Sequence, residues 1–133
     1  MTARILRGSC LCGDCTYEVE DTFAYAFICH CSQCRPATGA ASKPFAGITT
    51  EALRLHAPER LLRYGDDDSH DGHYSRCGSL LFSLVRERRY VHVTLGTLLD
   101  NPTIRPSAHI FAGSKADWDT ICDDLPAFDG LPS

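Results

Sequence analysis

The sequence lacks a run of basic residues. Its 13 lysines and arginines are outnumbered by 17 aspartates and glutamates, which gives a formal net charge of −4 at pH 7. A protein that holds nucleic acid or an anionic membrane surface needs clustered positive charge. We therefore expect no nucleic-acid partner and no membrane partner.

Long apolar segments are also absent. No stretch approaches the roughly 18 apolar residues that a membrane-spanning helix needs, and residues 1–7 lack the apolar run of a signal peptide. These absences predict a cytoplasmic protein. Thiols stay reduced in that compartment, so the eight cysteines indicate metal or redox chemistry rather than a disulfide framework.

Six cysteines form two copies of one spacing, Cys-x-Cys-x-x-Cys. The first copy is Cys10, Cys12 and Cys15, and the second is Cys29, Cys31 and Cys34. Cysteines this close on a tight turn can converge on one tetrahedral ion such as Zn²⁺, whose thiolate ligands lie about 2.3 Å from the metal. Cys77, which precedes Gly78, adds a further donor. The spacing predicts metal sites.

The number of thiols indicates that the two sites differ. Without Cys122, seven cysteines remain, enough for one closed site and one site with three protein ligands. A site with three ligands keeps a position for water or substrate. Three thiolates leave Zn²⁺ with a net negative charge, which favours a soft ligand such as a substrate thiol and would deprotonate it.

Other uses of the cysteines remain open at this point. Both sites could serve only to hold the fold together, as in zinc ribbons. Iron–sulfur ligation is disfavoured because neither triplet has a ferredoxin spacing. A redox role for Cys31 and Cys34 is disfavoured because a thioredoxin-type motif belongs beside a βαβ unit, which the sequence does not indicate.

Short alternating segments predict a mainly β domain over residues 1–133. The expected strands are 16–20, 25–28, 53–55, 80–85 and 90–95, with a polar loop at 66–73 and a turn at 100–102. One helix is expected near the C-terminus. It would begin at Ser114, carry Trp118, Ile121, Cys122 and Leu125 on one apolar face, and end at Pro126. On that face Cys122 is expected to be a small core residue.

Several other polar residues are weaker candidates. Arg35 and Lys43 follow the second triplet and could hold carboxylates of an acidic substrate. His30 is expected to face solvent between two ligands, although histidine is the usual acid–base group near neutral pH. His70 and His73 with Asp71 could form a metal cluster, but an exposed acidic loop explains them as well, and His92 and His109 are interpreted as structural.

The ordered motifs resemble the glutathione-dependent formaldehyde-activating enzyme family, also called the GFA or CENP-V/GFA domain. The resemblance rests on Gly8-Ser9-Cys10-Leu11-Cys12-Gly13 with Tyr17, on Cys29-His30-Cys31-Ser32-Gln33-Cys34-Arg35, and on Cys77-Gly78-Ser79. It continues through 93–100, Pro106, His109-Ile110, Trp118 through Leu125-Pro126, and Phe128. The similarity thus extends over nearly the whole chain.

This resemblance implies a zinc-binding fold of the Mss4-like or β-tent type, built from small antiparallel sheets. It implies a structural zinc at Cys10, Cys12 and Cys77, and a more labile, reactive zinc at Cys29, Cys31 and Cys34, so about one or two zinc ions per chain. The implied activity is that of a zinc-dependent carbon–sulfur lyase acting on glutathione or a related thiol and its aldehyde adduct, as in S-hydroxymethylglutathione synthesis. The alternative is a non-catalytic, zinc-stabilised module that binds glutathione or a protein partner.

The chain departs from the family pattern at one ligand. The family's later motif is approximately Phe-Cys-x-x-Cys-Gly, and Tyr74 stands here at the position of its first cysteine. The structural site therefore lacks its usual fourth thiolate. Cys15 is the preferred substitute and His73 the second choice, and the site could also be open or empty.

Overall fold

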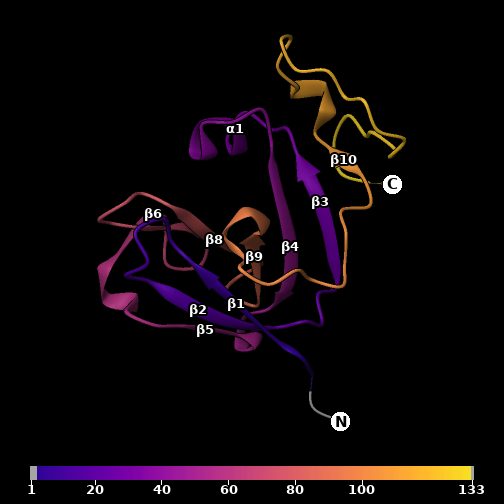
Figure 1. The fold of residues 1–133 in the computed structure, drawn as a ribbon. Coiled ribbons are helices and arrows are strands. Elements are labelled where there is room, and N and C mark those ends of the chain that lie inside the picture. Colours follow the sequence, from indigo (N-terminus) through magenta and orange to yellow (C-terminus); the bar gives the residue numbers. More distant parts are fainter. Residues whose placement is uncertain (1–2, 133) are drawn as a thin grey trace.

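The computed structural model describes residues 3–132 and contains two β-sheets (Figure 1). The smaller sheet has the strand order β1-β2-β5, and the larger has the order β10-β3-β4-β9-β8-β7-β6. The strands of the smaller sheet are β1 (Ile5–Ser9), β2 (Thr16–Glu20) and β5 (Leu53–Leu55). Those of the larger are β3 (Tyr25–Cys29), β4 (Lys43–Thr49), β6 (Leu61–Gly65), β7 (His70–Tyr74), β8 (Leu80–Val85), β9 (Tyr90–Thr94) and β10 (His109–Ile110). The predicted mainly β fold is confirmed.

The five expected strands all form, but the loop expected at 66–73 is only half correct. Strand β7 begins at His70, because residues from His70 onward pair antiparallel with β6 on one side and β8 on the other. Every pairing in the larger sheet is antiparallel except that of β10 with β3, which is parallel.

The two faces of the larger sheet have different neighbours. One face carries Ile48, Phe82 and Val93, which form a buried core with Leu6 and Tyr17 of the smaller sheet. The opposite face carries a second, smaller apolar cluster made by Cys29, Phe45 and Ile110. Because residues alternate along each strand, neighbours in sequence serve the two faces in turn.

The helix α1 (Cys34–Thr38) is the one α-helix in the part of the chain that the structure describes. Pro36 is tolerated because it lies in the first turn, where a backbone N–H has no intrahelical partner. The helix ends at Gly39, whose φ of 65° is left-handed and whose N–H donates to the carbonyl of Arg35 at 2.8 Å. This helix lies beside the second cysteine triplet.

The helix expected after Ser114 is wrong. Ser114 ends the short 3₁₀ helix Ala112–Ser114, and residues 115–126 are irregular. A short helix in water depends on packing its apolar face, but Trp118 is 72% exposed and Cys122 is exposed too. Cys122 is therefore not the core residue that the pattern predicted.

The C-terminal segment folds back along β10 instead. His109 N–H donates to the carbonyl of Pro126, and Phe128 N–H donates to the carbonyl of His109, both at 2.9 Å. Figure 1 shows this yellow segment at the same end of the molecule as α1, while β1, β2 and β5 lie at the other end. Among residues 3–132 no helix has the length and apolar character that crossing a bilayer requires.

Candidate metal centres and their cavity

The structure brings six cysteines into two groups of three. Within each group the sulfur atoms lie within 4.8 Å of one another. The first group is Cys10, Cys12 and Cys77, and the second is Cys29, Cys31 and Cys34. Thiolates around a tetrahedral zinc ion, each about 2.3 Å from the metal, are about 3.8 Å apart, so both groups fit zinc.

Two turns and their contacts build the first group. Gly13 and Gly78 follow the cysteines of these turns with φ values of 85° and 82°, a conformation that glycine adopts without strain. The Cys10 and Cys12 sulfurs are 3.6 Å apart, and the hydroxyl of Ser79 accepts from the N–H of Leu11 at 2.8 Å. The ends of β1 and β7, distant in sequence, are thereby held together.

Neither proposed substitute for the fourth ligand belongs to this first group. The Cys15 thiol is fully buried and donates to the carbonyl oxygen of His56 at 3.2 Å, and burial raises its pKa to about 11. His73 Nδ1 lies 3.2 Å from the carbonyl oxygen of Gly78. The preference for Cys15 is thus not supported by the placement of its sulfur, and Tyr74 is buried at 1% exposure in the core.

The second group lies where β3 ends and α1 begins. Cys29 is the last residue of β3, and the N–H of Cys34 donates to the sulfur of Cys31 at 3.2 Å. The hydrogen bond with Cys34 lowers the pKa of Cys29 to about 6, against the opposing effect of burial. The same bond and burial raise the pKa of Cys34. One thiolate is thus favoured in this group even without a metal.

His30 is buried beside this group, not solvent-facing as the sequence suggested. It is 1% exposed, and its Nε2 lies 2.8 Å from Nδ1 of His109. His109 Nε2 in turn lies 3.0 Å from both carboxylate oxygens of Asp123. If the His109 Nε2–H donates a hydrogen bond to the Asp123 carboxylate and that ring carries one proton, Nδ1 accepts a hydrogen bond from Nε2 of His30. His109 is thus structural, as expected, and ties the C-terminal segment to the second group.

A cavity of about 1020 Å³ adjoins the second group. Cys29 and Cys34 line it, and Lys43 lies beside Cys29 because it is the β4 partner of that residue in the sheet. Its other walls come mainly from the outer face of the larger sheet, above all from the rings of Tyr25, Phe27, Phe45, His92 and Phe111. The residues of the first cysteine group do not line it.

Lys43 is the most unusual polar residue of the cavity. It is 4% exposed, and its ammonium donates to the hydroxyl of Ser83 at 2.6 Å. Ser83 donates onward to the carboxylate of Asp71 at 2.6 Å. The bond to Ser83 is the only hydrogen bond of the Lys43 ammonium among the described residues. Two of its three N–H groups are therefore available to a ligand.

The sequence indicated some of these residues and missed others. Lys43 lines the cavity as a candidate for anion binding, but Arg35, predicted together with it, does not. His92, interpreted as purely structural, lines the cavity, and so does Asp71, interpreted as part of an exposed loop. Ser83 and the aromatic rings were missed. The alternation of Tyr25, Phe27 and Cys29 along one strand was the available signal, since it places all three on one face.

Comparison with known proteins agrees with these motifs. The family model described as "Glutathione-dependent formaldehyde-activating enzyme" matches residues 5–114, which include both cysteine groups and Lys43. A crystal structure of a Rhodobacter sphaeroides protein is similar, with 27% sequence identity and a TM-score of 0.60. The match covers 73% of this chain and 91% of that one. No curated protein matches the chain.

Proposed function

Since this chain belongs to the glutathione-dependent formaldehyde-activating enzyme family, we propose that it acts on a small thiol such as glutathione and on the thiol's carbonyl adduct. The proposed site is the second cysteine group, with zinc as its metal. The proposed reaction is that of a carbon–sulfur lyase, run here in the direction of adduct formation. The two groups of reduced cysteines would suit a cytoplasmic location.

The observation that carries this proposal is the position of the second cysteine group. Two of its cysteines, Cys29 and Cys34, line a cavity of about 1020 Å³, next to a buried ammonium group. Ligand sites are typically concave and mostly apolar, with a few placed polar groups. The three cysteines of the first group do not line this cavity, which favours a structural role for them.

Cys29, Cys31 and Cys34 would hold the zinc, which would supply the Lewis acidity that lets an incoming thiol react as its thiolate at neutral pH. Lys43 is the proposed hydrogen-bond donor to the oxygen of the carbonyl compound. Its free N–H groups can donate to the negative charge that develops on that oxygen when sulfur adds to the carbonyl carbon. Ser83 and Asp71 fix the ammonium for this purpose.

The proposal is tested with Cys31→Ser, with Cys122→Ser as a matched control because Cys122 is exposed and belongs to neither group. Metal analysis of reduced protein should give about two zinc ions per chain for the wild type and for Cys122→Ser, and about one for Cys31→Ser. Only Cys31→Ser should lose formation of S-hydroxymethylglutathione, with little change in melting temperature.

Two outcomes contradict this proposal. If Cys31→Ser loses fold and zinc together, the second group serves only to hold the fold. If the wild-type protein binds glutathione but forms no adduct with any carbonyl compound, the chain is a binding module without turnover. Metal analysis with and without glutathione accompanies both measurements, because a thiol that occupies the site should retain its zinc against a chelator.

A further inference from the structure

The cavity beside the second cysteine group has a floor of aromatic rings. Tyr25 and Phe27 are stacked at 5.7 Å between ring centroids, and Phe45 and His92 are stacked at 4.3 Å. Phe27 also meets Phe45 edge to face at 6.1 Å. These residues come from β3, β4 and β9, which are neighbours in the larger sheet, so the rings form one continuous surface.

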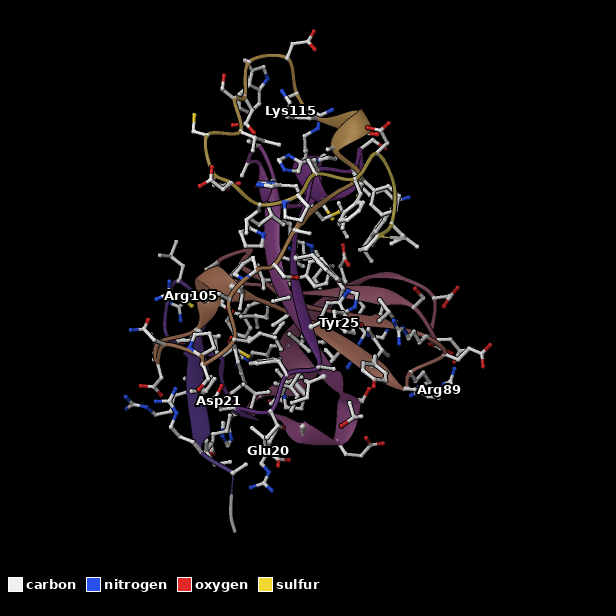
Figure 2. The ribbon with its side chains drawn as sticks, turned by 90° about the vertical axis from the view of Figure 1, so that its right-hand side faces the viewer. Glu20, Asp21, Tyr25, Arg89, Arg105 and Lys115 are labelled. Atoms are coloured by element: carbon white, nitrogen blue, oxygen red, sulfur yellow. The ribbon has the colours of Figure 1, made fainter. Side chains whose placement is uncertain are left out.

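These rings are held in place before any ligand arrives. A hydrogen bond of 2.7 Å joins the Tyr25 hydroxyl to His92 Nε2. The absence of a side chain at Gly47 leaves the room that the Tyr25 ring fills, because a Cβ there would lie 2.3 Å from it. Figure 2 shows Tyr25 toward the middle of the molecule. A surface fixed in this way loses little conformational entropy on binding.

The charged side chains beside these rings, Lys43, Asp71 and Arg86, already have partners within the protein. Lys43 and Asp71 are already linked through Ser83. Arg86 lies over the rings of Tyr25 and Tyr90, at 5.4 and 4.8 Å from their centroids. Burial, and then the charges of Lys43 and Arg86, lower the pKa of His92 to about 3, so this ring is neutral. Aromatic rings offer no hydrogen-bond partner to the polar backbone and charged ends of glutathione, and formaldehyde carries no group that could pack against them.

We propose that the carbonyl compound processed at this site carries an aromatic ring, which packs against Phe27 while its carbonyl oxygen faces Lys43. This inference rests on the proposed function and names its substrate class, an aromatic aldehyde. The thiol sulfur forms a bond to the carbonyl carbon, and the π electron pair moves to the oxygen. That oxygen takes up one proton, equal to the one that the thiol releases. The product is a hemithioacetal, and no oxidant or reductant is consumed.

The test is a calorimetric titration of the zinc-loaded full chain with S-benzylglutathione and with S-methylglutathione. The two probes share the tripeptide and differ in the ring. Burial and stacking of one ring should make the benzyl compound bind at least about tenfold more tightly. Equal affinities, or failure of both probes to bind a protein that binds glutathione, overturn the inference and leave the proposed thiol site intact.

Two variants locate the ring. Phe27→Leu removes a half-buried ring from the cavity, and it should reduce the preference for the benzyl compound severalfold. Phe23→Leu is the matched control, because Phe23 packs against the core on the other face of the sheet. A preference that Phe23→Leu reduces as much as Phe27→Leu does would overturn the placement of the ring in this cavity.

Titration with benzyl alcohol separates this inference from the proposed function. Benzyl alcohol carries the ring but neither thiol nor peptide. If it binds the wild type and binds Phe27→Leu more weakly, the aromatic site is present. Failure of glutathione itself to bind then contradicts only the proposed thiol chemistry. If benzyl alcohol leaves both proteins unchanged and the two thioethers bind equally, the aromatic site is absent.

Discussion

Lys43 combines burial, charge and an incomplete set of hydrogen bonds. A buried ammonium is costly unless it is paired, and here one partner, Ser83, satisfies only one of its three donors. Replacing Lys43 by methionine keeps the length of the side chain and removes the donors.

We expect Lys43→Met to lower kcat/KM for adduct formation by about tenfold or more, which is the usual effect of losing a hydrogen bond from a charged group. Zinc content should not change, and metal analysis checks this. Lys115→Met is the matched control, since within residues 3–132 the Lys115 ammonium donates only to the carbonyl groups of Ala116 and Asp119. Activity that is equal in the two variants would remove Lys43 from the site.

Tyr74 is the residue that sets the first cysteine group apart. Tyr74→Cys would restore a Cys-x-x-Cys turn with Cys77, and a fourth thiolate should slow removal of zinc by a chelator severalfold. The same change empties the space of a ring that is 1% exposed, so the metal-free protein should melt at a lower temperature. Chelator competition and thermal melting measure the two effects, and unchanged zinc retention would contradict the first.

The cysteine groups could be predicted from sequence because a Cys-x-Cys turn is local. The fate of Cys15 could not be predicted from the triplet spacing, since it depends on where β2 begins. Cys15 immediately precedes that strand and lies on the buried side with Tyr17 and Val19. Alternation along the strand therefore directs its thiol into the core and not toward the other two cysteines of its triplet.

At the scale of single elements, β4 places Lys43 and Phe45 in the cavity. Gly47 of the same strand leaves room for the Tyr25 ring to lie across the sheet. We expect Gly47→Ala to lower the free energy of unfolding by about 1–3 kcal/mol, the usual cost of overpacking. Urea unfolding measures this change. Gly96→Ala is the matched control, because an added Cβ there has no neighbour within 4 Å, and an equal loss in both variants would contradict the steric explanation.

The C-terminal segment shows why one element was predicted incorrectly. Its apolar spacing fits a helix, but a helix forms only if a surface covers its apolar face. Residues 126–130 instead bond through their backbone groups to β10 and the residues after it. The sequence carries the spacing of Trp118 and Ile121, but the position of β10 beside β3, which decides the outcome, is a long-range property.

The cavity belongs to the whole molecule, since the outer faces of several strands line it. No local sequence motif indicates such a surface, so Ser83 and the ring cluster were missed. Lys43 was found because it is close to the cysteines in sequence. The same arrangement buries neutral histidines.

This burial predicts a loss of stability in acid. The pKa of His92 is lowered to about 3 in the folded protein, whereas an unfolded histidine titrates near 6.5. The unfolded chain therefore binds more protons between these values. Above pH 6.5 His92 is neutral in both states and does not change the free energy of unfolding. Between pH 6.5 and 3 the free energy of unfolding decreases as the pH falls, by up to about 1.4 kcal/mol per pH unit.

His92→Gln should flatten this dependence, and urea unfolding at pH 7 and pH 5.5 measures it. Loss of metal on acidification affects both proteins, so the difference between their slopes isolates His92. His56→Gln, at an exposed ring, is the matched control. Parallel slopes for wild type and His92→Gln would show that burial does not keep this ring neutral.

The open edge of the first cysteine group has a consequence for the exchange of metal with the surroundings. Cys12 is exposed, Leu11 is 86% exposed, and a tyrosine replaces the fourth thiolate. A small chelator can reach an ion held there directly from solvent, whereas an ion at the second group is reached through the cavity that Cys29 and Cys34 line. If zinc occupies both groups, as we propose, its loss from the first group would lower the melting temperature, whereas its loss from the second would stop adduct formation.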